Sequence, residues 1–190
     1  MSRGRKPVVY TFLGVPGSGK TYFARNLAKE SGAVRLSSDA IRLAIFGSRE
    51  KTTEIYNSGD RQILNSYVFN ALDYATGQIL EKGHDVIQDA HHNKRSDRQS
   101  VQVIAEKRGA IVVLVHIQTP YEVALQRGQD RDETDDQRKH SKKEMTEVIK
   151  KHMAVMDQPD STENVIEIDG TQKFEEQYAS FTKQLSEITS

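Results

Sequence analysis

Residues 14–21 read GVPGSGKT and match G-x-x-x-x-G-K-S/T at every fixed position. An apolar run, Val8–Leu13, precedes them, and a segment with a helical pattern, Thr21–Glu30, follows. In such a strand–loop–helix unit, glycines let the backbone turn sharply, so that its N–H groups meet phosphate oxygens at the positive end of the helix dipole. The stretch therefore predicts a phosphate-binding loop.

The side chains of this loop indicate how a nucleoside triphosphate would be held. Lys20 is expected to place its charge between the β- and γ-phosphates, and Thr21 to offer its hydroxyl to Mg²⁺. The predicted cofactors are therefore ATP and Mg²⁺. The residues expected to contact the nucleotide are Gly14, Pro16, Gly17, Ser18, Gly19, Lys20 and Thr21. Motors, GTPases and kinases share this loop, so the rest of the sequence must distinguish them.

Five short apolar runs, rich in β-branched residues and with little alternation, are typical of strands buried on both faces of a parallel sheet. The segments between them are long enough for crossover helices, with two helices expected between the second and third runs. The chain is thus predicted to form a single doubly wound α/β domain, a P-loop NTPase fold over residues 1–190 with helices on both faces. The runs are Val8–Leu13, Val34–Ser37, Val86–Asp89, Ile111–Ile117 and Val165–Ile168.

Two segments carry the clearest helical periodicity, Asp60–Glu81 and Ser141–Asp157. Four apolar residues of the second segment fall on one face and are expected to pack in the core. They are Met145, Ile149, Met153 and Met156.

Residues 128–143 contain no large apolar side chain and cannot bury themselves in a core. We expect a charged lid here, entered through Arg127 and carrying Arg131. One of these arginines would neutralise the charge that builds up in a transition state, and the lid would exclude water. A solvated charged loop is the alternative.

The composition excludes several classes of function. The chain contains no cysteine, which rules out disulfides, cysteine-ligated zinc and a thiol nucleophile, and which fits a cytoplasmic location. Lys and Arg together number 27, as do Asp and Glu, so no large duplex-binding surface is indicated. No run reaches the roughly 18 apolar residues of a membrane span, so no membrane association is expected.

Asp39 and Arg42 follow the second apolar run and lie one turn apart on a predicted helix, Asp39–Phe46. Because the carboxyl ends of parallel strands share one edge of the sheet, both residues are expected near the phosphate loop. Asp39 would accept the proton of an attacking hydroxyl, a contribution typically worth about 10²–10⁴-fold in rate. Arg42 would anchor an acceptor anion. The alternative is that Asp39 only caps the helix.

Asp89 ends the third apolar run, a position at which many phosphate-loop proteins place a carboxylate. Either Asp89 or Asp39 would help Thr21 to hold the metal through water. A strand-end turn is the alternative role for Asp89. His91 and His92 follow closely, but they are not expected to bind a metal, because no carboxylate is paired with them at helical spacing.

The chain resembles the P-loop kinases related to polynucleotide kinase in four stretches: GVPGSGKTYFARNLA (14–28), SSDAIR (37–42), VIQDAHHN (86–93) and MDQPDSTENVIEID (156–169). Zeta toxins and chloramphenicol phosphotransferase are similar, more distant relatives. The resemblance implies a five-stranded parallel sheet of order 2-3-1-4-5 and nearly covers the whole chain.

The same resemblance implies roles for individual residues. Asp39 would be the general base, and an arginine at the lid would clamp the phosphates. The acceptor site would include Arg42, Asp89 and Asn93. Relatives in the polynucleotide branch commonly carry threonine after the third-strand aspartate, where this chain has Ala90, so the nature of the acceptor stays open.

The sequence therefore predicts an ATP-dependent kinase that transfers the γ-phosphate to a hydroxyl of a small molecule, a nucleoside or a nucleic-acid 5′ end. The alternative is an ATP-dependent binding or regulatory module with little acceptor phosphorylation.

Overall fold

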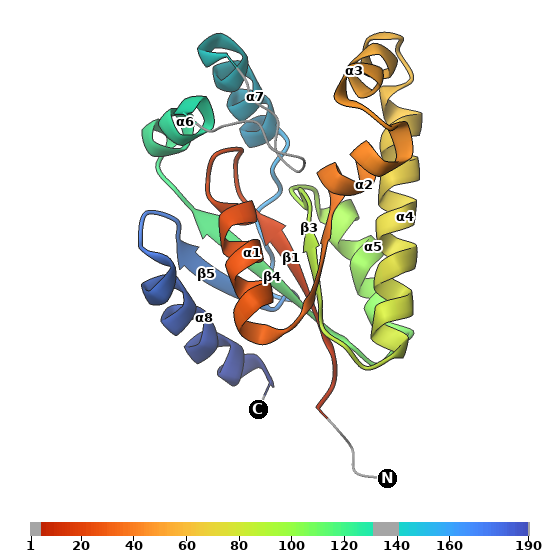
Figure 1. Ribbon diagram of the computed structural model, residues 1–190. Helices are drawn as coiled ribbons and strands as arrows, with labels where there is room; N and C mark the ends of the chain where they lie inside the picture. Colours follow the sequence, from red (N-terminus) through yellow and green to blue (C-terminus); the bar gives the residue numbers. More distant parts are fainter. Residues whose placement is uncertain (1–4, 131–140, 190) are drawn as a thin grey trace.

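The structure is a computed structural model that describes residues 5–130 and 141–189. Its centre is a sheet of five parallel strands in the order β2-β3-β1-β4-β5, which confirms the predicted fold (Figure 1). In register, Leu13 pairs with His116 and Ser37 pairs with Asp89, so the carboxyl ends of the strands form one edge. The strands are β1 (Val8–Leu13), β2 (Val34–Ser37), β3 (Val86–Asp89), β4 (Ile111–Gln118) and β5 (Val165–Asp169).

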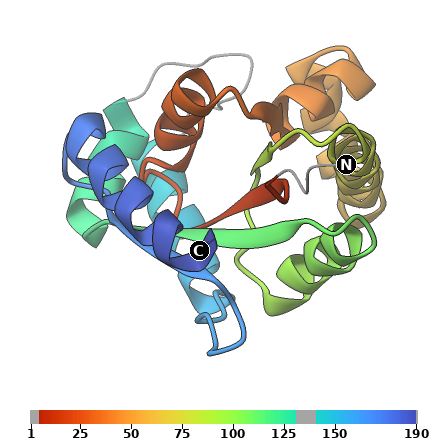
Figure 2. The ribbon, with the colours of Figure 1, turned by 90° about the horizontal axis from the view of Figure 1, so that it is seen from below.

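Helices surround the sheet in the described part of the chain. They are α1 (Lys20–Ser31), α2 (Ser38–Phe46), α3 (Arg49–Asn57), α4 (Arg61–Glu81), α5 (Arg95–Glu106), α6 (Tyr121–Asp130), α7 (Lys142–Ala154) and α8 (Phe174–Thr189). The helices α1 and α8 cover one face of the sheet, and α4 and α5 cover the other (Figure 2). None of these helices is long and apolar enough to cross a membrane.

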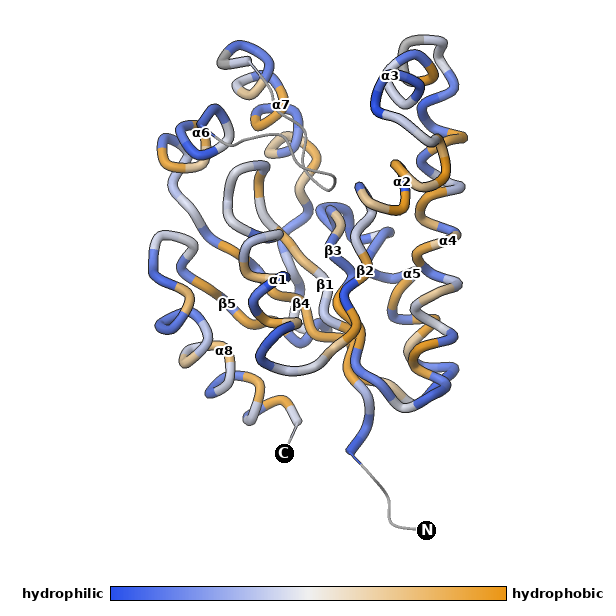
Figure 3. Tube along the Cα trace, viewed as in Figure 1, coloured by the Kyte–Doolittle hydropathy of each residue, from blue (hydrophilic) through white to orange (hydrophobic). Residues whose placement is uncertain are grey.

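The strand side chains alternate between two apolar layers. On β1, Val8, Tyr10 and Phe12 pack with the residues of α1 and α8, whereas Val9 packs with those of α4 and α5. Hydrophobic residues accordingly concentrate along the strands and on the helix sides that face them (Figure 3). The strands β1 and β3 are buried on both faces, as the lack of polar alternation predicted, whereas the edge strand β5 alternates between buried and exposed residues.

An aromatic cluster fixes α1 on the sheet. The ring of Phe23 on α1 lies 6.4 Å from that of Phe12, 5.8 Å from that of Phe174 and 5.5 Å from that of Phe181, measured between centroids. Such aromatic pairs contribute about 0.5–1.5 kcal/mol each beyond their burial. Because β1 and α1 are both anchored in this way, the loop between them is held at its two ends.

Three helices, rather than the predicted two, connect β2 to β3. Gly47 ends α2 with φ +79°, and the side chain of Ser48 caps α3 by accepting the N–H of Lys51. Most residues of α3 are exposed or half-buried. Its sequence therefore lacks the apolar period by which a helix is detected, and the prediction missed it.

The helices α6 and α7 form an arm beside the carboxyl edge of the sheet (Figure 1). Met145 and Ile149 of α7 pack with Ala124 of α6 and with Val15, as the predicted core face requires. Met153, predicted on the same face, is instead 51% exposed, because α7 touches its neighbours along only part of that face.

Both ends of the segment predicted as a lid, residues 128–143, belong to helices in the structure. Residues 128–130 continue α6, and Ser141 caps α7 through a capping box with Glu144. Residues 131–140, which make up the rest of the predicted lid, lie outside the described residues.

Candidate active site

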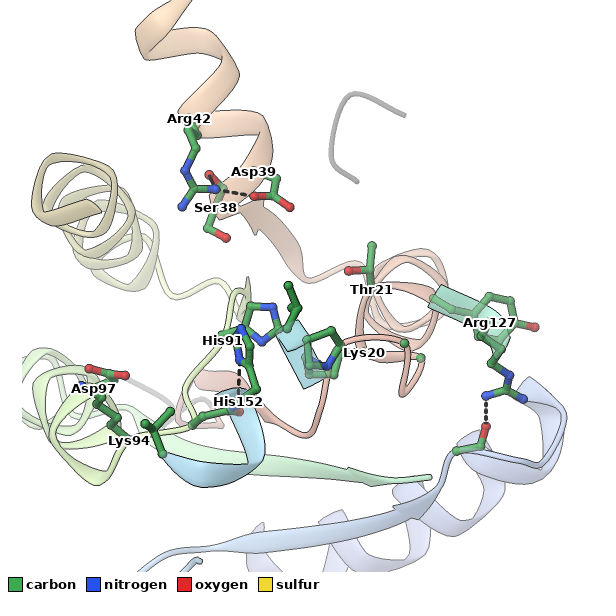
Figure 4. Close-up of a pocket in the computed structure, with 18 of the residues that line it drawn as sticks. Lys20, Thr21, Ser38, Asp39, Arg42, His91, Lys94, Asp97, Arg127 and His152 are labelled. Carbon is green, nitrogen blue, oxygen red and sulfur yellow. Dashed lines mark hydrogen bonds and ion pairs between the residues drawn. The ribbon is translucent and has the colours of Figure 1, made fainter. Parts of the chain in front are cut away.

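A cavity of about 930 Å³ lies at the carboxyl edge of the sheet. Its lining comes from the phosphate loop, α2, α4, the segment between β3 and α5, the arm of α6 and α7, and the segment between β5 and α8 (Figures 1 and 4). Ligands of doubly wound folds bind at this edge. Among the described residues, its charged lining consists of Lys20, Asp39, Arg42, Arg61, Lys94, Asp97, Arg127 and Lys173.

The phosphate loop contains glycines at positions where a side chain has no room. Gly17 has φ +83°, and a Cβ there would lie 2.1 Å from the carbonyl oxygen of Ala124 on α6. Gly14 has φ +143°, and a Cβ there would lie 2.7 Å from the carbonyl oxygen of Ile117 on β4. Positive φ and close backbone approach both favour glycine. The glycines of the motif therefore allow the loop to pack directly on α6 and β4.

Lys20 lies inside the curve of this loop. Its Nζ donates to the carbonyl oxygens of Gly14 and Val15, at 2.8 Å in each case, and the residue is only 8% exposed. The ammonium group is thus fixed beside the N-terminus of α1, where the N–H groups of the first turn have no partner within the helix. A buried cation beside a helix N-terminus fits the phosphates of a nucleotide.

Thr21 and Asp89 form the corner that would hold a metal. The hydroxyl of Thr21 donates to Oδ1 of Asp89 at 3.1 Å. Mg²⁺ usually binds one or two protein oxygens together with phosphates and waters, rather than an all-protein cage. The described residues contain no cluster of three His, Cys, Asp or Glu ligands. A hydroxyl next to a carboxylate fits Mg²⁺ bound together with a nucleotide.

Asp89 is also tied to β2. Arg35 donates through Nε and Nη2 to Oδ2 of Asp89, at 2.9 and 2.5 Å. Burial raises the pKa of Asp89, whereas the guanidinium of Arg35 and the hydroxyl of Thr21 favour its ionised form. Asp89 does not itself line the described cavity. Of its two predicted roles, the geometry favours help to the metal over contact with an acceptor.

Asp39 does not cap α2. The N-cap is Ser37, whose side chain accepts the N–H of Ala40 at 3.3 Å. The carboxylate of Asp39 instead forms an ion pair with Arg42, and the two lie across the cavity from Lys20 (Figure 4). Arg42 also donates to Oδ1 of Asn65 on α4, at 3.3 Å. The pair therefore joins α2 to α4 and fixes the direction of the carboxylate.

Asn93 links the phosphate loop to α7. Its Oδ1 accepts the N–H of Gly14 at 3.4 Å, and its Nδ2 lies 3.3 Å from Nδ1 of His152. Because an amide nitrogen can only donate, Nδ1 of His152 is the acceptor, and its proton is on Nε2. The ring of His152 lies 4.6 Å from that of His91, and both histidines line the cavity. No local pattern in the sequence predicts that His152 lies in the site.

His92 does not line the cavity and anchors the same segment. Its Nε2 lies 2.9 Å from Oε1 of Gln88, whose Nε2 donates to Thr76 and Asp73. His92 is only 1% exposed, and this burial lowers its pKa to about 4. The uncharged ring therefore belongs to the structure that positions His91 and Asn93, rather than to the cavity.

Arg127 lies at the end of the cavity opposite to His91 and His152 (Figure 4). Its Nη1 donates to the carbonyl oxygen of Gly170, at 2.6 Å, in the segment between β5 and α8. The polar residues of this segment were not predicted, because a polar stretch after a strand has no distinctive motif. The cavity residues at this end are Gly170, Thr171, Gln172, Lys173 and Gln177. The other predicted arginine, Arg131, lies outside the described residues.

Two helices present further residues that the sequence analysis missed. Arg61, Asn65 and Phe69 recur at intervals of four residues on α4. Val148 and His152 on α7 and Val155 at its C-cap recur at intervals of four and three. At these spacings the side chains lie on one face of a helix. Each helix buries an apolar face elsewhere, and that stronger pattern concealed these mixed faces.

A family model described as an AAA domain matches residues 9–159. The chain therefore belongs to the AAA domain family. A search of curated proteins finds no significant match.

Two solved structures share the fold over almost their whole length. An unliganded sugar kinase from Janibacter sp. HTCC2649 is 20% identical with a TM-score of 0.67, over 95% of each chain. A gluconokinase from Sinorhizobium meliloti 1021 is 18% identical with a TM-score of 0.63, over 98% of this chain and 95% of that chain. At these identities the likeness shows the fold. The suggested relationship to polynucleotide kinase, zeta toxins and chloramphenicol phosphotransferase stays a prediction.

Gly17→Ala is expected to weaken nucleotide binding at least about tenfold, because the new methyl group must displace the backbone of α6. Calorimetric titration with magnesium and ATP measures the effect. Gly109→Ala is the matched control, because Gly109 also has a positive φ, of +64°, but a Cβ there would have no neighbour within 4 Å. Equal nucleotide affinities for the two variants would contradict this account of the loop.

His92→Gln is expected to reduce the loss of stability in acid. Unfolded His92 takes up a proton near pH 6.5, whereas the folded form, with a pKa of about 4, does not. The stabilising effect is therefore present above pH 6.5 and is lost as the pH falls towards 4. Between pH 7.5 and 5, the wild type should lose about 2 kcal/mol more unfolding free energy than the variant, measured in urea. Parallel pH profiles would show that the prediction is wrong.

Proposed function

We propose that this protein is an ATP-dependent kinase that transfers the γ-phosphate to a hydroxyl group of a small molecule. One observation carries the proposal: the carboxylate of Asp39 and the phosphate-loop residues Lys20 and Thr21 line a single cavity. Phosphoryl transfer requires mainly positioning and charge stabilisation, with a carboxylate to receive the hydroxyl proton. The cavity contains both parts.

The fold and the dimensions of the cavity support a small acceptor. Two of the solved structures that share this fold are named a sugar kinase and a gluconokinase. Beyond the phosphate loop, the remaining part of the cavity is enclosed by residues of α2, α4 and α7. The whole volume, about 930 Å³, falls in the range of pockets for a nucleotide and a compound of sugar size.

The nucleotide is proposed to bind along the phosphate loop. Lys20 would bind the β- and γ-phosphates, and Arg127 would contact the phosphates from α6. The hydroxyl of Thr21 would bind Mg²⁺, with Asp89 holding a metal-bound water. The metal would supply charge neutralisation at the phosphates.

Asp39 is proposed to act as the general base. It would accept the proton of the acceptor hydroxyl while the hydroxyl oxygen forms its bond to the γ-phosphorus. The bond from that phosphorus to the bridging β–γ oxygen breaks at the same time, which leaves ADP. The ion pair with Arg42 would hold the carboxylate towards the acceptor, so Arg42 is a positioning residue in this scheme.

Asp39→Asn is expected to lower kcat at least about a hundredfold, because the amide cannot accept the hydroxyl proton. The affinity for magnesium and ATP should stay within about twofold, because Asp39 lies across the cavity from the loop. ADP release is the measurement, with sugars, polyols, nucleosides and 5′-hydroxyl oligonucleotides as acceptors. Glu30→Gln removes a carboxylate from the exposed end of α1 and is the control.

Normal turnover by Asp39→Asn with the best acceptor would show that the assigned base is wrong. Hydrolysis of ATP without any preferred acceptor, together with ATP-dependent capture of a protein partner, would instead favour the regulatory module.

A further inference from the structure

The charge of the cavity differs from that of the chain. The whole chain has no net charge, yet the described lining of the cavity contains six lysines and arginines against two aspartates, an excess of four positive charges. A complex of ATP with Mg²⁺ carries about two net negative charges, so the cavity retains positive charge after the nucleotide is counted.

The excess extends to the acceptor side. Lys20, Arg127 and Lys173 belong to the nucleotide side, and Arg42 forms an ion pair with Asp39. Arg61 on α4 and Lys94 before α5 line the acceptor side, where the described lining contributes one further carboxylate, that of Asp97. Lys94 and Asp97 lie on the same side of the cavity as His152 in the close-up view (Figure 4).

The surroundings of His152 contain the same excess of positive charge. Burial is the main cause that lowers the pKa of His152 to about 4, and the nearby charges of Lys20, Arg61 and Lys151 lower it further. The charged neighbours that shift this pKa are all cations, so the cavity around His152 has a positive potential.

From this arrangement we infer that the acceptor is an anionic small molecule, whose carboxylate or phosphate ester lies beside Arg61, Lys94 and His152 while its hydroxyl faces Asp39. The inference rests on the proposed kinase function and specifies its substrate class. Charged hydrogen bonds to a carboxylate or phosphate are about twice as strong as neutral ones. Nε2 of His152 carries a proton that such an anion can accept, while Phe69 and Val148 offer apolar surface to the carbon chain.

The test compares matched acceptors that differ only in charge. Aldonic acids of three to six carbons are compared with the corresponding alditols, and sugar phosphates with the parent sugars, by ADP release. The anionic member of at least one series should have a kcat/KM at least about tenfold higher. The two series distinguish a carboxylate from a phosphate ester.

Charge-removing variants then locate the anion. Arg61→Gln and Lys94→Gln should each raise the KM for the best anionic acceptor at least about fivefold, with the affinity for magnesium and ATP unchanged. Lys107→Gln, at an exposed position after α5, is the matched control and should leave the KM as it is.

Two outcomes would overturn the inference in distinguishable ways. If the uncharged acceptors are turned over as well as the anionic ones, or if neither variant changes KM, the protein is a kinase but its acceptor is not held by this cluster. If no acceptor of either series stimulates ADP release, the proposed kinase function fails and the inference fails with it.

Discussion

The rest of the site depends on the close packing of the phosphate loop against its neighbours. A Cβ on Gly17 would strike α6, one on Gly14 would strike β4, and one on Gly170 would lie 2.7 Å from the carbonyl oxygen of Ser18. Elements that are far apart in the sequence thus contact one short loop directly through backbone atoms. The amide of Asn93 adds a fourth contact, because it accepts the N–H of Gly14 and reaches His152 on α7. The positions of α6, α7 and the β5–α8 segment are in this way tied to the conformation of the loop.

The charged residues are also distributed unevenly between the cavity and the rest of the chain. Acidic and basic residues balance over the chain, yet the described cavity is strongly basic and Asp89 is paired with Arg35 outside its lining. A carboxylate without a cation partner stays protonated more readily when buried, and Arg35 and Thr21 oppose that effect at Asp89. Asp39, in contrast, is partly exposed to the cavity and is held by Arg42. Two carboxylates at adjacent strand ends therefore have different environments, one beside the metal corner and one facing the acceptor.

Much of the fold was predictable, because the five apolar runs and the glycine motif are local signals. The strand bounds differ from prediction by at most one residue, at β4 and β5. The helix α3 was missed, and Met153 was wrongly placed in the core, because solvent-exposed helical surface has no diagnostic period. At the site, Asp39 and Arg42 were predicted to lie together and do so. His152, Arg61 and Lys94 were missed because their proximity arises only when α4, α5 and α7 converge on one cavity, which no local pattern encodes.

The central claim is that the loop around Lys20 binds the phosphates of a nucleoside triphosphate. Calorimetric titration of the wild type and of Lys20→Ala with ATP and Mg²⁺ tests it most directly. The account predicts measurable binding by the wild type and a loss of affinity of at least about thirtyfold in the variant, because a buried charged donor to phosphate is removed. Absence of heat from the wild type with any nucleoside triphosphate, or equal affinities for the two proteins, would contradict it.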